Sequence, residues 1–252
     1  MNGLGMDNLD WDIMLPALIA GALVLATHVP LGMRVLARGV IFVDLAIAQI
    51  AGLGVIAAGL LNLEQNVFAV QGMAVSCALL GAALLAYTEH KRPKIQEASI
   101  GLVFVLASTL GILLLSRDMH AGEHLKDMLA GQILWVSRDQ LIATAILTAA
   151  LFGLWLVFRG RFPRFAFYGQ FALAVTASVQ LVGVYLVFTS LIVPALATYR
   201  CEKWRMAIAY GIGIAGYAAG LLLSAWLDLP AGPAIVWGMA MCGGAYALWK
   251  RL

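Results

Sequence analysis

The chain has 252 residues, of which 63% are hydrophobic and only 12% are charged, and its mean hydropathy is +0.93. Sixteen basic and thirteen acidic side chains are too few to cover the surface of a water-soluble chain of this size, which excludes a soluble globular protein. The formal net charge of +3 is small and the basic residues lie in short links, so the composition predicts an integral membrane protein without a nucleic-acid partner.

Long apolar runs follow one another along almost the whole chain. A membrane-spanning helix needs about 20 apolar residues. Runs of this kind predict spans at 13–33, 39–61, 66–87, 98–116, 140–158, 206–226 and 232–249. The residues before the first run carry acidic side chains and no basic one, so we expect that run to be a retained span and not a signal peptide.

Basic residues gather in groups between these runs. Because cytoplasmic links are enriched in Lys and Arg, we expect all the groups to be cytoplasmic. They are Arg34 and Arg38; His90, Lys91, Arg92 and Lys94; Arg159, Arg161 and Arg164; Arg200, Lys203 and Arg205; and Lys250 and Arg251. The intervening links at 62–66, 117–139 and 227–231 are neutral, mixed or acidic, and we expect them outside. The N-terminus is therefore predicted outside and the C-terminus inside.

The stretch 170–199 is too long for one span and contains Gly183 and Pro194. To keep the basic groups on both of its sides cytoplasmic, the chain must cross and return. We predict a span over 170–184, a turn at Gly183 and a short helix over 187–199. The whole chain, 1–252, is thus predicted to be a single transmembrane domain with no soluble domain. Its predicted fold is all-α, a polytopic helical bundle of about eight full transmembrane helices plus one short returning helix.

Two ionisable side chains fall within predicted spans, where a charge is costly and therefore a functional candidate. His28 lies six residues before Arg34, and Asp44 lies six residues after Arg38. On neighbouring antiparallel helices both would lie about 9 Å from the arginine belt. An imidazole and a carboxylate suit a divalent transition metal, and equally a proton. Alternatively, His28 donates to a carbonyl freed by Pro30, and Asp44 accepts from helix N-terminal amides.

Other polar residues are weaker candidates. Gln49 shares a predicted helix with Asp44 but lies about 140° round it, and Gln180 lies near the predicted reversal, where helix–helix hydrogen bonds are the alternative role. A further candidate metal site in the outer link consists of His120, Glu123 and His124. Their i, i+3, i+4 spacing would place them on one helical face, as an entrance site or simply as a solvated surface.

Four stretches carry a resemblance over most of the chain. They are PLG with RGVIFVDLAIAQIAGLG, then LKDMLAGQILWVSRDQL, then VTASVQLVGVYLVFTSLIVPALATYR, and finally LDLPAGPAIV. In this order they resemble the membrane subunit of bacterial ATP-driven metal importers, the zinc and manganese permease family also called ABC-3. The basic residues that flank the predicted reversal agree with that family's fold.

The resemblance implies a non-enzymatic subunit in the bacterial inner membrane that forms the gated pathway as a homodimer in the lipid bilayer. It also implies a periplasmic metal-binding protein and a separate cytoplasmic ATPase as partners, with ATP bound by that ATPase and no cofactor bound by this chain. The cargo it implies is a divalent metal, zinc or manganese. FPRFAFYG, within a basic cytoplasmic loop at 159–169, resembles the family's coupling segment. This assigns the ATPase contact to Arg161, Pro163, Phe165, Ala166 and Gly169.

The family's metal-facing Asp and His, four residues apart on the second span, are altered in this sequence. Aligning the RG pair and the later GV pair without a gap places Leu45 at the family's Asp and Gln49 at its His. Asp44 is one residue away, and His28 is our candidate for the replaced ligand. Alternatives are therefore a metal chelate as cargo, a proton-coupled carrier without an ATPase, and an intramembrane enzyme, for which His28 with Asp44 is the only suitable constellation.

Overall fold

The computed structural model describes residues 11–63, 65–116, 129–157 and 163–250, and within these ranges the regular structure is helical. The helices are α1 (Trp11–Arg38), α2 (Val43–Leu60), α3 (Val67–Lys91), η2 (Pro93–Ile95), α4 (Gln96–Leu115), η3 (Ile133–Trp135), α6 (Arg138–Val157), α7 (Arg164–Val182), α8 (Val184–Ala197), α9 (Arg205–Leu227) and α10 (Ala231–Trp249). Among the described residues, seven helical segments are long and apolar enough to cross a membrane, and α8 is a shorter apolar helix. The predicted polytopic all-α membrane fold is confirmed.

The chain forms two compact units, each assembled from segments far apart in the sequence. The first unit comprises Met1–Met33, Ala130–Thr148 and Leu181–Leu252. The second unit comprises Arg34–Leu129 and Ala149–Gln180. The first unit thus holds most of α1 with α8, α9 and α10, and the second holds α2, α3, α4 and most of α7.

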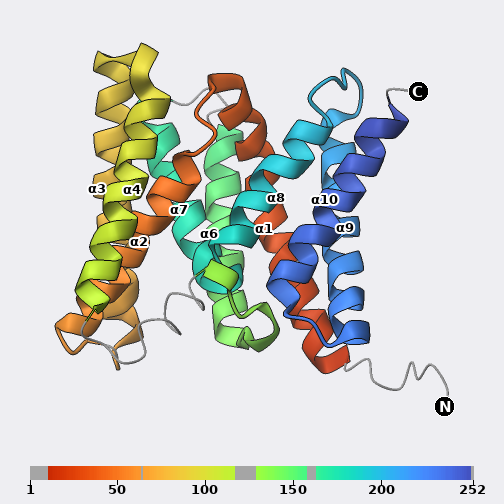
Figure 1. Cartoon of the computed structure of the whole chain (residues 1–252), viewed down its shortest axis with the longest axis horizontal. Helices are drawn as coiled ribbons and strands as arrows, with labels where there is room; N and C mark the ends of the chain where they lie inside the picture. The colour runs from red at the N-terminus through yellow and green to blue at the C-terminus, as the bar shows by residue number, and fades with distance from the viewer. Residues whose placement is uncertain (1–10, 64, 117–128, 158–162, 251–252) are drawn as a thin grey trace. The chain divides into compact units, whose positions relative to one another are not determined.

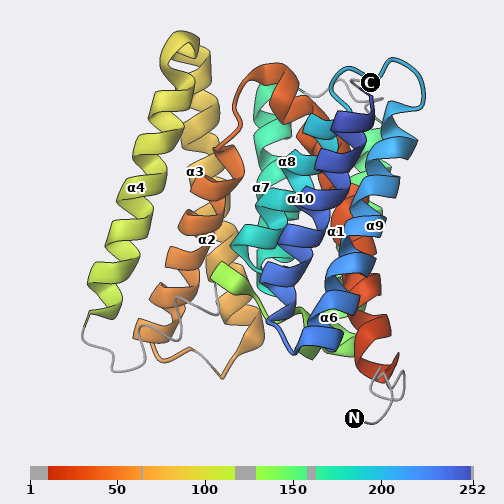
Figure 2. The same ribbon diagram turned by 45° about the vertical axis from the view of Figure 1, so that its right-hand side comes forward.

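In the first unit, α10 packs against both α9 and α8, and Figures 1 and 2 show α9 and α10 side by side. Glycines allow the two backbones to approach closely. A Cβ atom added at Gly220 of α9 would lie 2.2 Å from the Cα of Ile235 on α10, and one at Gly216 would lie 2.6 Å from the Cα of Met239. Small residues at this contact let two membrane helices pack backbone to backbone.

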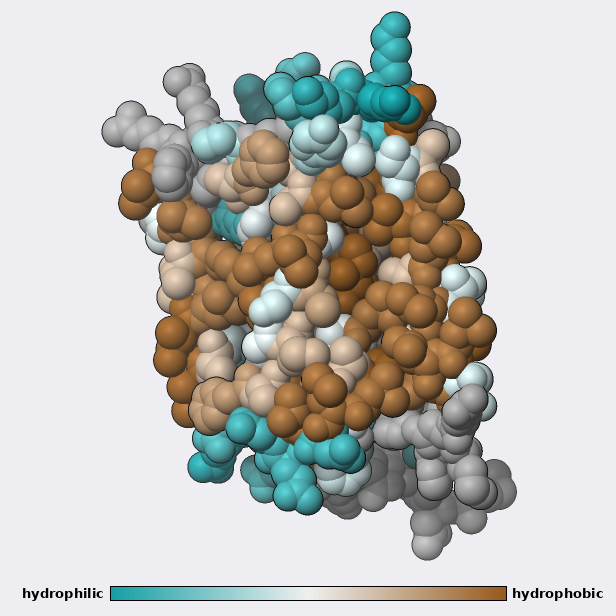
Figure 3. Space-filling view, turned by 90° about the vertical axis from the view of Figure 1, so that its left-hand side faces the viewer, coloured by the Kyte–Doolittle hydropathy of each residue, from teal (hydrophilic) through white to brown (hydrophobic). Residues whose placement is uncertain are grey.

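In the second unit, α2 packs against α3 and α4, as both ribbon views show. Only 17% of the apolar stretch of α4 and 22% of that of α3 is buried, against 56% for α2. Figure 3 shows the face over α3 and α4, where hydrophobic residues cover most of the middle and hydrophilic residues gather at the two ends. In a bilayer this face meets the lipid chains, since an apolar outer band suits a hydrocarbon core.

The boundary between α1 and α2 differs from the predicted one. Gly39 has a φ of +71°, and its N–H donates to Leu36 O while that of Val40 donates to Val35 O, which is a Schellman end to α1. Helix α2 therefore starts at Val43 and not at 39. Asp44 therefore sits in the first turn of α2, and not six residues along a helix that follows Arg38 directly.

The break predicted at Gly183 is confirmed. Helix α7 ends at Val182 and α8 begins at Val184, with Gly183 between them at a φ of +80°. A Cβ at Gly183 would lie 2.4 Å from the backbone N of Gly131, so a second chain segment presses against the break. The short helix covers 184–197, slightly earlier than the predicted 187–199, because the helix starts directly after the glycine.

Within each unit, the described basic groups gather at one end. In the second unit, Arg38 pairs with Glu89 of α3 at 3.7 Å, one residue before the group that starts at His90. In the first unit, Cys201 Sγ lies 3.1 Å from the Tyr246 hydroxyl, which brings the group at 200–205 to the end of α10. This clustering is the arrangement that the positive-inside pattern requires.

Candidate translocation site

Helix α1 carries His28 close to Pro30, where the helix loses one backbone hydrogen bond and a side chain of α9 replaces it. Pro30 has no N–H, so the carbonyl of Ala26, four residues earlier, has no partner within the helix. The Tyr210 hydroxyl on α9 donates to that carbonyl at 3.1 Å. The His28 ring contacts Val24 O instead, so the alternative role for His28, donation to the carbonyl freed by Pro30, is wrong.

His28 is fully buried and uses one ring nitrogen to fix its orientation. Nδ1 lies 2.9 Å from Val24 O and 3.0 Å from Thr27 Oγ1. A carbonyl only accepts, so Nδ1 carries the proton, and Nε2 of the neutral ring presents a lone pair. Nε2 is buried and has no hydrogen-bond partner. Histidines that bind metals commonly donate their other N–H to a carbonyl in this way, and the ligand role of His28 stays a prediction.

Asp44 is also buried, at the start of α2. It is 1% exposed, and its Oδ1 accepts a hydrogen bond from the N–H of Leu45 at 2.8 Å. The side chain of Phe42, the residue before the helix, makes no capping hydrogen bond. The Asp44 side chain instead accepts from an amide of the first turn, where the positive end of the helix dipole favours a negative charge. This contact agrees with the alternative role predicted for Asp44. This amide contact does not prevent the carboxylate from binding a cation.

The two glutamine candidates lie in the second unit. Gln49 is buried in α2, 6% exposed. Gln180 on α7 accepts a hydrogen bond from Gln71 Nε2 on α3, while its own Nε2 is buried without a partner. This contact is a helix–helix hydrogen bond of the kind that was the alternative for Gln180.

Several predicted candidates are not brought together within the described chain. His120, Glu123, His124 and Arg161 lie outside the described residues. Among the residues that the structure describes, no group of three or more His, Cys, Asp or Glu side chains is placed to hold a metal ion. His28 belongs to the first unit and Asp44 to the second, so their pairing stays a prediction.

The predicted coupling segment is not a loop beyond residue 163. Helix α7 starts at Arg164, six residues before the predicted start of the span, because Phe167 N–H already donates to Pro163 O. Pro163 and Phe165 are exposed, and Ala166 and Gly169 are half-buried. The early start follows from packing, since aromatic side chains inside this segment are buried and need a fixed helical face.

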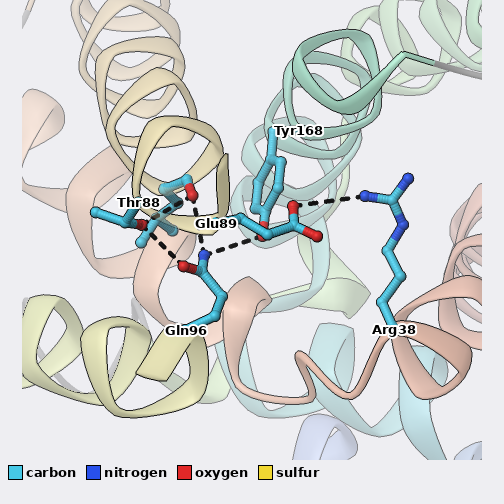
Figure 4. A network of polar contacts seen from close by, with 6 residues as sticks. Arg38, Thr88, Glu89, Gln96 and Tyr168 are labelled. Carbon is cyan, nitrogen blue, oxygen red and sulfur yellow. Dashed lines mark hydrogen bonds and ion pairs between the residues drawn. The ribbon is translucent and has the colours of Figure 1, made fainter. Parts of the chain in front are cut away.

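A polar network at the start of α7 was missed in the sequence. Figure 4 shows Thr88 and Glu89 of α3, Gln96 of α4, Tyr168 of α7 and Arg38 of α1 converging in the second unit. Gln96 Nε2 donates to the Tyr168 hydroxyl at 3.1 Å, and Thr88 Oγ1 donates to Gln96 Oε1 at 2.9 Å. The available signal was a polar glutamine immediately before an apolar run, together with a tyrosine inside an aromatic segment.

These features define the class of protein: a multi-pass helical membrane protein with polar side chains buried inside its spans. The chain belongs to the ABC 3 transport family, whose sequence pattern matches residues 10–172 and 161–242.

Three relatives are similar over different shares of the chain. A Haemophilus influenzae protein named a probable iron transport system membrane protein is 28% identical over 171 residues, 59% of this chain and 62% of that one. Two proteins named probable metal transport system membrane proteins also match. The one from Chlamydia trachomatis is 23% identical over 69% of this chain and 66% of its own length. The one from Thermotoga maritima is 27% identical over 91% and 87%. The matches thus span just under two thirds of the first two relatives and most of the third.

The fold is also similar to that of a solved structure, PsaBC from Streptococcus pneumoniae in complex with Fab. The TM-score is 0.71, the sequence identity is 21%, and the match covers 95% of this chain and 90% of that one. This likeness concerns the fold alone.

Proposed function

We propose that this chain is the permease subunit of an ATP-driven importer for a divalent transition-metal ion. The family membership supports transport, and the relatives' names support a metal as cargo. The observation that carries the metal assignment is the buried His28 ring, whose Nε2 lone pair has no partner inside a membrane-spanning helix. Imidazole nitrogen binds Zn²⁺, Mn²⁺ or Fe²⁺, and these three are the proposed cargo ions.

The energy source lies in a separate subunit in this proposal. The sequence contains no phosphate-binding G-x-x-x-x-G-K-[ST] loop, so ATP is bound and hydrolysed by a cytoplasmic partner. Exposed Phe165, at the start of α7, is the proposed contact. A periplasmic binding protein delivers the ion to the opposite, outer side.

A homodimer completes the metal site in this proposal. A transition-metal ion binds several ligands at once, and the described residues of one copy contain no group of three suitable side chains. A two-fold axis would bring the same few ligands from each of two copies to one point. The proposed ligands from each copy are His28 and Asp44, with Gln49 and Gln180 along the pathway.

Uptake by reconstituted vesicles tests this function. The chain is co-expressed with the ATPase subunit that copurifies with it, inserted into proteoliposomes, and supplied with Mn²⁺, Zn²⁺ or Fe²⁺ with and without ATP. We expect uptake of at least one free ion that requires ATP. Uptake that follows a proton gradient without ATP would instead identify a proton-coupled carrier, and uptake of a chelated metal alone would change the cargo.

A further inference from the structure

We propose that a partly buried polar joint passes the movement of the ATPase-binding end of α7 to the first turn of α2. The joint consists of Arg38, Thr88, Glu89, Gln96 and Tyr168, all in the second unit. The proposal rests on the proposed function, because it assumes that an ATPase binds at Phe165.

The start of α7 has two different faces within four residues. Phe165 is 56% exposed and free to meet a partner, whereas Phe167 and Tyr168 are 1% and 0% exposed. The two buried rings pack edge to face, with centroids 5.5 Å apart. A force on the exposed face is therefore delivered to the side chains on the buried face, since a single helical turn carries both.

Gln96 connects that buried face to two other helices. Its Nε2 donates both to the Tyr168 hydroxyl, at 3.1 Å, and to Leu85 O on α3, at 2.9 Å. Its Oε1 accepts from the Thr88 hydroxyl on α3. Gln96 is the first residue of α4 and is 3% exposed, so one buried amide ties the start of α4 to α3 and α7 (Figure 4).

Arg38 connects the buried face of α7 and the end of α3 to the segment that leads into α2. Its guanidinium lies 4.1 Å from the centroid of the Phe167 ring and pairs with Glu89 at 3.7 Å. Arg38 is the last residue of α1, and only the turn 39–42 separates it from α2. At the far side of this turn, the N–H of Phe42 donates to Glu97 Oε1, next to Gln96, at 3.3 Å.

The turn before α2 is thus held at both of its ends by residues of the joint or beside it. Asp44 follows Phe42 by two residues and shares the first turn of α2. A buried polar group that loses its partner is costly, so the buried Tyr168 and Gln96 move together. The half-buried Thr88 follows Gln96 through the hydrogen bond between them. A connection of this kind transmits a displacement of α7 to the residues around Asp44.

Tyr168→Phe and Gln96→Met test the joint, because the first removes one hydroxyl and the second keeps the side-chain length without hydrogen bonds. Tyr217→Phe in the first unit is the matched control, since Tyr217 is equally buried and its hydroxyl lies 3.0 Å from Ser190 Oγ. Each variant is purified with the copurifying ATPase and reconstituted. ATP hydrolysis and uptake of whichever free ion the wild type carries are measured in the same vesicles.

We expect both joint variants to retain the ATPase and its hydrolysis while ions moved per ATP fall about tenfold, within the usual range of coupling between sites. Tyr217→Phe is expected to keep the wild-type ratio. A purely structural role would lower the amount of folded complex and leave that ratio unchanged. If Tyr168→Phe, the milder variant, moved as many ions per ATP as the wild type, the proposed joint would be wrong, while the proposed function would stand. Absence of ATP-driven uptake in the wild type would overturn the proposed function and the joint with it.

Discussion

His28 is held by the helix that carries it. One ring nitrogen contacts the carbonyl of Val24 one turn earlier, and the other is buried without a partner. The orientation is thus set locally, and in the proposed function the other nitrogen binds the cation. Preorganised ligands of this kind lose little affinity to ordering.

The variant His28→Ala should weaken uptake of a free metal ion by about 10- to 100-fold, because the ion loses an imidazole that replaces part of its water shell. Uptake of a chelated metal should change much less. Radioactive or fluorescence-detected uptake in proteoliposomes measures both. The exposed His90 provides the control variant His90→Ala, for which wild-type uptake is expected. Equal uptake in the two variants would remove His28 from the pathway.

Asp44→Asn should abolish uptake while the folded protein persists. The amide oxygen of Asn can still accept from the Leu45 N–H, but the negative charge that attracts a cation is lost. Asp139→Asn is a matched control, since Asp139 is an exposed acidic residue in the first turn of α6. Uptake and thermal unfolding are measured for both variants. A transporting Asp44→Asn protein would limit this carboxylate to its role at the helix start.

At the scale of the helices, glycines decide how closely elements approach. Gly216 and Gly220 on α9 face α10 with almost no space for another carbon atom. Gly211 on the same helix has nothing within 4 Å of an added Cβ. Helix α9 therefore contains both a constrained glycine surface and an unconstrained position for comparison.

Gly220→Ala should destabilise the protein by about 1–3 kcal/mol, because an added methyl group would collide with the Cα of Ile235, 2.2 Å away, and force the helices apart. Gly211→Ala should be neutral or stabilising by about 0.5–1 kcal/mol, since alanine favours a helix. Unfolding of the purified protein in detergent, followed by circular dichroism, distinguishes them. Equal stability of the two variants would contradict close packing of α9 on α10.

At the scale of the whole molecule, the charge pattern predicts which ends face the cytoplasm. Gln65, in the link between α2 and α3, and Lys203, before α9, are both exposed and predicted on opposite sides. In a chain whose Cys77, Cys201 and Cys242 are replaced by serine, an impermeant thiol reagent added outside should label Gln65→Cys and spare Lys203→Cys. The reverse labelling would invert the predicted topology.

Partner binding gives a second test at this scale. Phe165→Asp should release the ATPase, because it places a charge on the exposed aromatic at the start of α7 and loses apolar contact area. Trp135→Asp is the control, since Trp135 is 78% exposed but is predicted on the outer side. Copurification of the ATPase with each tagged variant is the measurement. Retention of the ATPase by Phe165→Asp would move the contact away from α7.

The candidate site was only partly predictable. Burial of His28 and Asp44 followed from their places in apolar runs, because ionisable side chains within such runs almost always face the inside of the helical bundle. The carbonyl freed by Pro30 was assigned to the wrong donor, since the hydroxyl of Tyr210, 184 residues from Ala26 in the chain, donates to it. Gln96 and Tyr168 were missed because they matter through the hydrogen bond between them, and residues 72 positions apart in the chain give no sign of that contact.

The sequence by itself determined the class of the fold, the approximate positions of most spans and the break at Gly183; it predicted about eight full spans, whereas seven described helical segments are long and apolar enough to cross a membrane. These depend on hydrophobic length, loop charge and the conformational freedom of glycine, all of which are local properties. Only the tertiary structure decided that α7 begins at Arg164, that glycines of α9 touch α10, and that Gln96 meets Tyr168. Contacts between distant segments depend on how whole helices pack against one another, and one-dimensional patterns do not record that packing.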